Sequence, residues 1–424
     1  MWVERVQYAV GQGGFHGGGV YAGSYRDCTL PPAFTYVYDC GSDQSWALDP
    51  AVDRFAARFG DIDALFISHL DRDHVNGIDS LLSKADVDTV YLPYLNDVCQ
   101  VLDLLEADGE SGLSGSLIEA ALDPASWFGS RGVRRVIRVG PGGPEGSDGP
   151  FLPEPSREPE PDRSEIVAKI GPQDATVLTQ GREGSRAELC RLTPGSSVVF
   201  SGDAGLLDWV LIPHVTPAPK ENVAAFLKAL RSALDLETGR RLNTSRLLEG
   251  LSKARTRKKM KDSYEAIIAG GARRMHNRIS MSLYSGPTGR GSRTHWVSEL
   301  DASRWLGHCP YQEAIPPAPV GWLGTGDATL KVEDVWNAFR AAYDPVLGEV
   351  VTLDLPHHGS KHNFRSDLTA LPGLRHAIAN ASKPSRHKHP SPYVIHELES
   401  AGIHAWLVSQ EPSTELEETV WQVR

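Results

Sequence analysis

Cysteine is scarce in this chain and does not occur in pairs. Five cysteines are scattered over the 424 residues without a Cys-x-x-Cys motif: Cys28, Cys40, Cys99, Cys190 and Cys309. An odd, dispersed set argues against a disulfide framework and against a structural zinc ribbon. Stability and chemistry must therefore be sought in other residue types.

Long apolar runs are also lacking. No run approaches the roughly 18 residues that a transmembrane helix needs. The first residues, MWVERVQYAVGQGG, contain charges early and no apolar core of the kind found in a secretory signal. With 40% hydrophobic and 23% charged residues, the composition is typical of a globular protein. We expect a cytoplasmic protein with no membrane partner.

An excess of positive charge is absent, since the formal net charge is -11. The surface as a whole is therefore not expected to attract nucleic acid non-specifically. The segment KARTRKKMK (253–261), followed by Arg273 and Arg274, departs from this pattern. It is either a solvated helix face or a local phosphate-binding patch beside an active site, and the sequence leaves both open.

The chain begins with alternating strand-like and helix-like runs. FTYVYDCGS and DALFISHL are typical of buried strands, and DPAVDRFAARFG between them has helical spacing and ends at a glycine. This alternation predicts an α/β fold.

From about residue 100 short helix-like patterns mix with the strand-like runs RRVIRVG and SSVVFSGDAG, and the amphipathic helical runs NVAAFLKALRSALD and SRLLEGLSKARTRKKMKDSYEAIIAGG follow. A Pro/Glu-rich stretch at about 141–165 is typical of a flexible loop. Strand patterns return from NRISMSLYSG onward.

Ionisable residues gather where one apolar strand ends. The stretch ALFISHLDRDHVNGI (64–78) places His69, Asp71, Asp73 and His74 within six residues. Two imidazoles and two carboxylates around one turn can hold a divalent metal such as Zn, Mn or Fe. The alternative is a surface loop in which Asp73 is the N-cap of the following helix.

Other strand ends repeat this design. LDLPHHGSKHN (353–363) ends an apolar run in histidines, and GTGDATL places Asp327 on a turn after a strand. RHKHPSP adds His387 and His389, and the proline holds His389 in an extended conformation. The histidines thus concentrate at strand ends, which favours a metal site over scattered core positions.

Taken together, these motifs resemble the metallo-β-lactamase superfamily, whose signature is HxHxDH. The variant HxDxDH, HLDRDH here, is similar to the ComEC-type branch of that superfamily. Further stretches match the branch in order along the chain: VGQGG, YVYDCGS, NRISMSLYSG with WLGTGDA, LPHHGSKHN and the final HP. The matches run from residue 8 to about 400, with a gap between about 96 and 275.

The resemblance implies a four-layer αββα sandwich with a large, partly helical insertion. Its first half would be residues 1–95, the insertion 96–275 and its second half 276–424. It also implies two divalent metal ions, Zn or Mn, with His69 and Asp71 mainly at the first and Asp73 and His74 at the second. Asp327 would bridge the ions and His357 would be a late ligand.

The remaining roles follow from the same resemblance. His358 would lie behind the metal ligands or contact substrate, and His389 would be a ligand or a proton donor; Asp73 and His389 would be the catalytic residues. Ser360 and Lys361 either contact phosphate oxygens or belong to a plain turn. The choice between His357 and His358 as the ligand stays open, although His357 is favoured.

Two departures from the family pattern stand out. The usual third-motif histidine has no clear counterpart; His214 and His276 are candidates, but each is more typical of a structural or surface residue. A second Gly-Asp-Ala turn places Asp203 in competition with Asp327. Asp327 is favoured because NRIS precedes it and PHHGS follows it.

The metal set predicts a hydrolase that uses a metal-activated water. Asp71 in place of a histidine adds a negative oxygen ligand, which favours Mn or a Zn/Mn mixture and a phosphodiester substrate, nucleic acid or nucleotide. The alternative is hydrolysis of a small ester, lactone, thioester or amide. A third reading is a non-catalytic, metal-stabilised scaffold that binds a protein partner through the insertion.

Overall fold

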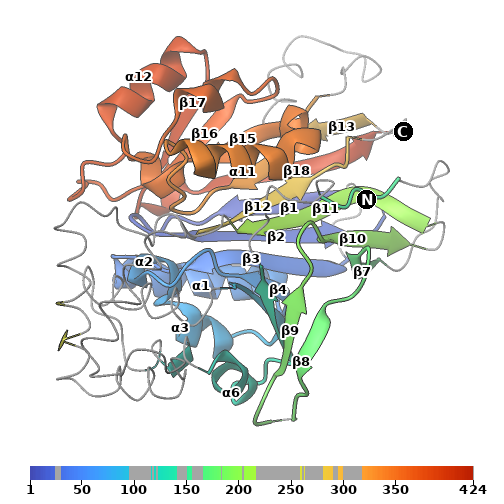
Figure 1. Cartoon of the computed structure of the whole chain (residues 1–424). Coiled ribbons are helices and arrows are strands. Elements are labelled where there is room, and N and C mark those ends of the chain that lie inside the picture. Colours follow the sequence, from blue (N-terminus) through green and yellow to red (C-terminus); the bar gives the residue numbers. More distant parts are fainter. Residues whose placement is uncertain are drawn as a thin grey trace, which may run out of the picture.

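Two large mixed β-sheets form the body of the protein in the computed structural model (Figure 1). The structure describes residues 1–23, 30–94, 116, 119–120, 123–140, 150–154, 166–182, 184–202, 205–215, 258–259, 262, 280–289, 295–298 and 318–423. Helices are few and lie on the outer sides of the sheets. The expected α/β class is therefore confirmed.

The first sheet has ten strands, and its parallel half contains the strand that leads into HLDRDH. Strands β3 to β6 and β9 run parallel, whereas the other neighbours pair antiparallel. In spatial order the strands are β13 (His295–Ser298), β18 (Leu416–Val423), β1 (Trp2–Gln7), β2 (Phe15–Tyr21), β3 (Phe34–Cys40), β4 (Ile62–Phe66), β5 (Val87–Pro93), β6 (Arg135–Val139), β9 (Glu188–Leu192) and β8 (Thr176–Thr179).

The second sheet has eight strands, of which β14 to β17 are parallel. Their spatial order is β17 (His404–Val408), β16 (His376–Asn380), β15 (Val350–Asp354), β14 (Gly321–Gly324), β12 (Met281–Gly286), β11 (Gly205–Val215), β10 (Ser197–Gly202) and β7 (Val167–Gly171). Nearly all side chains of β14, β15 and β16 are buried on both faces, as expected for parallel strands covered on both sides.

Three large apolar cores and one small one hold the described sheets and helices together. Phe66, Trp209 and Trp322 belong to the core between the two sheets. Phe55 of α1 (Ser45–Phe59) and Trp127 of α6 (Pro124–Gly129) pack with the ten-stranded sheet. On the other side, a core of the eight-stranded sheet includes side chains of α11 (Glu333–Tyr343) and α12 (Pro392–Ser400).

The remaining helices of the described chain are short. They are α2 (Arg72–Val75), α3 (Ile78–Leu82) and the 3-10 turns η3 (Asp344–Glu349), η4 (Pro356–Gly359), η5 (Ser366–Ala370) and η6 (Pro412–Thr414).

The interval 96–275, expected as a partly helical insertion, contributes the helix α6 and strands of both sheets among its described residues. β6, β8 and β9 extend the ten-stranded sheet, and β7, β10 and β11 extend the eight-stranded sheet. The helices expected after residue 220 lie outside the described residues, apart from 258–259 and 262. Lys258 and Lys259 of the basic segment 253–261 are helical and exposed. Most of the Pro/Glu-rich stretch 141–165 also lies outside.

Within the described part of the chain, no helix has the length and apolar character needed to cross a bilayer.

The loops that follow parallel strands bring the ionisable motifs together. HLDRDH follows β4, Asp327 follows β14, PHHGS follows β15 and His389 lies in the loop after β16. A backbone hydrogen bond from Met281 N to Ser68 O, 2.8 Å, joins the two sheets at this edge. In α/β sheets the carboxyl ends of parallel strands are the usual position of a ligand site. We therefore expect a ligand site at this edge.

Candidate metal centre

The HLDRDH turn begins directly after β4 and contains the short helix α2. Asp71 occupies the N-cap position of α2, but its side chain makes no capping hydrogen bond. Asp73 lies in the first turn of the helix, so the reading of Asp73 as an N-cap is wrong. Neither carboxylate is therefore used to cap the helix.

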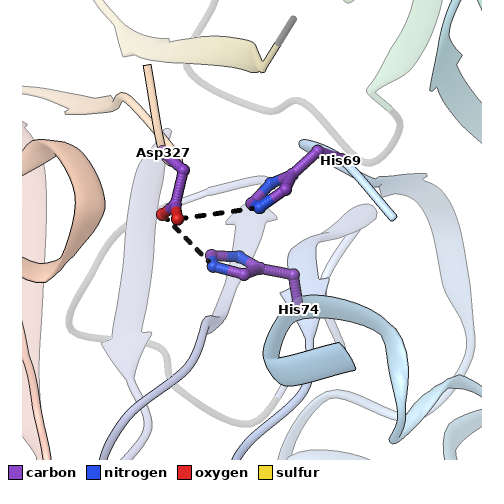
Figure 2. A group of neighbouring side chains, drawn as sticks. All are labelled: His69, His74 and Asp327. Carbon is purple, nitrogen blue, oxygen red and sulfur yellow. Dashed lines mark ion pairs between the residues drawn. The ribbon is translucent and has the colours of Figure 1, made fainter. Parts of the chain in front are cut away.

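One group of possible metal donors consists of His69 and His74, which follow a strand of the first sheet, and Asp327, which follows a strand of the second. His69 Nε2 lies 3.8 Å from Asp327 Oδ2, and His74 Nε2 lies 3.4 Å from Asp327 Oδ1. Figure 2 shows the two imidazoles pointing toward the carboxylate from the opposite side of the site. The three side chains are buried, and their ligand atoms all lie within 4.8 Å of one another. These residues can hold a metal ion.

A second group shares His74 with the first. It consists of Asp73, His74 and His358, with ligand atoms again within 4.8 Å of one another. His358 Nε2 lies 3.3 Å from Asp73 Oδ2 and 3.7 Å from Asp327 Oδ1. Because His74 and Asp327 adjoin both sets, the two groups form one continuous cluster with room for more than one arrangement of cations.

The buried atoms that face the cluster lack hydrogen-bond partners. Four such atoms are His69 Nε2, His74 Nε2, Asp327 Oδ1 and His358 Nε2. A buried polar atom without a hydrogen bond costs on the order of 1–3 kcal/mol. Four of them around one point could serve as donors to a divalent cation, so the residues present fit one.

Asp39 fixes the orientation of His74. Its Oδ2 lies 2.8 Å from His74 Nδ1, and both of its carboxylate oxygens also accept hydrogen bonds of 2.6 Å from Ser68. A carboxylate on one ring nitrogen directs the other nitrogen at a metal. Sequence reasoning gave Asp39 no role, although the Asp-x-Gly turn that ends YVYDCGS was the signal.

The loop that carries Asp327 is held by residues from other segments. Ser280 Oγ accepts a 3.1 Å hydrogen bond from Asp327 N, and Asn363 Nδ2 donates to Asp327 O over 2.9 Å. Gly326 has a φ of 50°, and a Cβ at this position would overlap with Ser280 Oγ. The Ser of NRIS and the Asn of SKHN thus position the shared carboxylate.

The two histidines of PHHGS point in different directions. Both have positive φ, 49° for His357 and 56° for His358. His358 is buried inside the cluster, whereas the side chain of His357 is 26% exposed with its Nδ1 3.5 Å from Asp327 Oδ2. Both are therefore near the shared carboxylate, and His358 is the one within the second group.

The other expected residues lie around this cluster. The Asp71 carboxylate is 3.5 Å from His69 Nε2. The His389 ring centroid is 5.3 Å from that of His357 and 6.1 Å from that of His358. Ser360 is buried and its N–H donates to His357 O, as in a turn, while Lys361 is exposed.

Of the two candidates for a third-motif histidine, the structure describes only His214, which lies apart from the cluster. His214 lies in β11 against Tyr343, with ring centroids 5.9 Å apart, and belongs to neither group of donors. Its burial lowers its pKa to about 4, as expected for a neutral core histidine. His276 and the alternative carboxylate Asp203 lie outside the described residues.

The charges of the cluster act on one another. Burial opposes the ionisation of Asp327, but the charges of His357 and His358 hold its pKa well below the usual range. Burial likewise opposes Asp73, but His74 and His358 lower its pKa to about 2. Against the effect of burial, the surrounding carboxylates hold the pKa of His74 well above its ordinary value. The ionised carboxylates thus make the site negative, and the negative charge that holds a proton on His74 would also attract a metal cation, which competes with protons for the same electron pairs.

Comparison with known proteins gives no family for this chain: no protein-family model matches it, and no curated protein matches it significantly.

Proposed function

We propose that the protein is a metal-dependent hydrolase that cleaves phosphodiesters. The observation that carries the proposal is the convergence of unpartnered donor atoms of His69, His74, Asp327 and His358 at one edge of two sheets. The helix-covered sheets and the order of the motifs support the four-layer αββα sandwich of the metallo-β-lactamase superfamily as the finer description of the fold.

The proposed metal is Zn or Mn, in a centre of two ions. His69, His74 and Asp327 would hold one ion, and Asp73 and His358 the other, with Asp71 and His357 adjoining the set. Ions bound here would lower the pKa of a water and offset negative charge on the oxygens of the substrate. The acidic share of this donor set favours hard cations and substrates rich in oxygen.

The chain's own residues prepare this chemistry. Asp39 holds His74 in one ring orientation, and Ser280 and Asn363 fix the Asp327 loop, so that the donors need not rearrange. Burial, followed by the charges of His358 and His357, lowers the pKa of His389 to about 3. A neutral His389 suits a ligand or a proton acceptor better than a proton donor.

The proposal is tested by metal content and hydrolysis together. We expect the purified protein to contain Zn or Mn by elemental analysis and to hydrolyse bis-p-nitrophenyl phosphate when Mn is supplied. His69→Ala and Asp73→Ala should each reduce hydrolysis by at least about 100-fold, since each removes a ligand. His396→Ala, an exposed histidine on α12, should leave it unchanged.

Other outcomes select the alternatives. A metal-containing protein that cleaves p-nitrophenyl acetate or a lactone but no phosphodiester would be a hydrolase of small esters. A protein that binds metal tightly and cleaves none of these substrates would be the non-catalytic scaffold. A protein without bound metal, and inactive with every metal added, would contradict the site itself.

A further inference from the structure

Several positive side chains lie on the loops around the candidate metal centre without forming a salt bridge in the described chain. Most described arginines are in ion pairs, among them Arg58, Arg134 and Arg365. Five cations on the loops that carry the metal-centre residues form no salt bridge within the described chain: Arg72, Lys361, Lys383, Arg386 and Lys388. We call these five residues the basic rim, although one of them, Arg72, acts electrostatically on Asp43.

The basic rim adjoins the donors through short links along the chain. Arg72 lies between Asp71 and Asp73, and Lys361 follows His358 by three residues. Lys383, Arg386 and Lys388 lie in the loop after β16 that ends at His389.

Contacts place this last loop beside the centre. The His389 ring adjoins those of His357 and His358, and His387 Nε2 lies 3.8 Å from Asp43 Oδ2. In a protein with a net charge of -11, unpaired cations gathered at these loops indicate an anionic ligand larger than the metal-bound group.

An exposed tryptophan lies beside the same loop. Trp46, near the start of α1, is 65% exposed and makes no ring contact or hydrogen bond within the described chain. Two residues earlier, Gln44 Oε1 accepts hydrogen bonds from Gln12 N and from Ser382 Oγ, at 3.0 and 2.7 Å. The beginning of α1 therefore touches the beginning of the basic loop 383–388.

A second exposed aromatic residue flanks the other end of that loop. Tyr393, in the first turn of α12, is 46% exposed and follows His389 by four residues. Trp46 and Tyr393 are the exposed aromatic side chains among the large exposed hydrophobics of the described chain. Cations along a groove with aromatic faces beside them are the elements by which proteins bind single-stranded nucleic acid.

We propose that the basic rim and Trp46 bind a single-stranded nucleic acid beside the metal centre, with phosphates on the rim and a base stacked on Trp46. The inference rests on the proposed phosphodiester hydrolysis and adds the surface that selects the substrate. A duplex keeps its base faces stacked inside, so it cannot use Trp46. A polyanion without bases would use the cations and leave the indole unused.

The test measures binding and not cleavage. Fluorescein-labelled oligothymidylate of about 12 nucleotides, within the site size of known single-strand binders, is titrated with the full chain in the presence of a chelator, and anisotropy is recorded. Trp46→Ala should weaken binding by roughly 5- to 100-fold, the range found for loss of one stacked base. Trp46→Phe should recover part of this loss because a phenyl ring also stacks.

Removal of rim charges has its own signature. Arg386→Ala/Lys388→Ala should reduce the slope of the logarithm of the binding constant against the logarithm of salt concentration by about 1.4, since each phosphate contact on a single strand contributes about 0.7. The matched control is Lys169→Ala/Arg182→Ala, which removes two exposed cations without acidic partners. These lie on β7 and in the turn between β8 and β9, on the other side of the molecule from α2 (Figure 1). The control should bind like the unmodified chain.

Each remaining outcome overturns the inference. These are no binding of the oligonucleotide, equal binding of a duplex, or unchanged affinity in Trp46→Ala when thermal unfolding shows a folded variant. Inorganic polyphosphate that competes as well as oligothymidylate would show a plain polyanion surface and would also overturn it. Failure of the proposed hydrolysis is recognised separately, by metal content and bis-p-nitrophenyl phosphate, which need no oligonucleotide.

Discussion

At the scale of single residues, Asp39 positions part of the candidate metal centre. It has a φ of 58° and is almost fully buried. Its carboxylate contacts both His74 and Ser68, which adjoins His69 in the chain. A single side chain therefore positions the segment that bears two of the histidine donors.

For Asp39→Asn we expect metal affinity to fall by about 10- to 100-fold, the usual effect of removing a partner that orients a ligand. Asparagine and aspartate both tolerate a positive φ, so the backbone conformation at residue 39 should be unchanged. The loss of metal affinity should then measure the effect of removing the negative charge. The measurement is metal affinity by competition with a chromophoric chelator.

The control for this variant is Asp63→Asn, the same change near the start of the neighbouring strand β4, whereas Asp39 lies near the end of β3. Asp63 accepts a hydrogen bond from Thr35 N and contacts no donor of the cluster. Affinity within about twofold of the unmodified protein is expected there, because only partners of a ligand alter its affinity. If both variants lose metal equally, Asp39 acts through general stability.

The two adjacent histidines of PHHGS should differ in their effect on metal retention. His358→Ala removes the partner of Asp73 inside the buried cluster, and leaving a buried charge without its partner costs about 3–5 kcal/mol. His357 is partly exposed, so His357→Ala should release less metal. Elemental analysis after gel filtration makes the comparison, and the reverse order would assign the ligand role to His357.

At the scale of elements, the turn between β1 and β2 supports the HLDRDH turn from behind. Gly14 N donates a 3.1 Å hydrogen bond to Asp73 O. A Cβ on Gly14 would lie 2.9 Å from His74 Nδ1 and 3.0 Å from Asp39 Cβ. The glycine therefore permits the close approach of two backbone segments at the point where His74 meets its carboxylate.

We expect Gly14→Ala to cost about 1–3 kcal/mol through overpacking and to weaken metal binding by displacing His74. Gly348→Ala in η3 is the matched change, because no atom lies within 4 Å of a Cβ there. Chemical denaturation and metal titration of both variants provide the measurement. Normal metal binding by a folded Gly14→Ala protein would show that the turn is not a support.

The sequence predicts the elements of the site better than their contacts. The ends of β4 and β15 could be predicted because in each case a run of apolar residues is followed by His and Asp residues. The orientation of His357 and His358 could not be predicted, since the positive φ at both positions decides it. Asp39 escaped notice because it precedes His69 by thirty residues and only the pairing of β3 with β4 brings them together.

The strands between residues 135 and 215 were harder to predict for a related reason. Short runs such as RRVIRVG and SSVVFSGDAG carry strand propensity but no sign of which sheet they join. β6 and β10 lie in different sheets, and that choice depends on long-range packing. Sequence patterns give the type of such elements more readily than their neighbours.

At the scale of the whole molecule, the candidate metal centre combines residues from two sheets and from two distant parts of the chain. His69 and His74 come from the ten-stranded sheet, and Asp327 and His358 from the eight-stranded sheet. A bound ion should therefore stabilise the assembled fold, by about 2.7 kcal/mol at a free metal concentration 100 times the dissociation constant.

The pH dependence of stability should reveal protons and metal competing for the same atoms. After chelation, the raised pKa values of His74 and His358 add stability that is complete below about pH 6.5 and is lost as the pH rises through them. The lowered pKa of Asp73 adds stability that is complete above about pH 4 and is lost as the pH falls toward 2. Chelated protein should be most stable between about pH 4 and 6.5.

Metal-loaded protein should not lose this stability above the window. Because metal binding releases the protons of these histidines, its stabilising effect grows as the pH rises. Thermal unfolding from pH 5 to 9, with Mn and with chelator, gives the two profiles. Parallel profiles would mean that these side chains do not bind the ion.

The pairing of β1 with β18 has a consequence for synthesis. Trp2 pairs with Trp421, and the buried ion pair of Arg5 with Glu418, 2.6 Å, joins the same two strands. During translation β1 leaves the ribosome about 400 residues before its neighbour β18. Until β18 follows, one edge of β1 lacks its partner and Arg5 lacks its counter-charge, so the nascent chain has a stretch of unpaired backbone that is open to pairing with other chains.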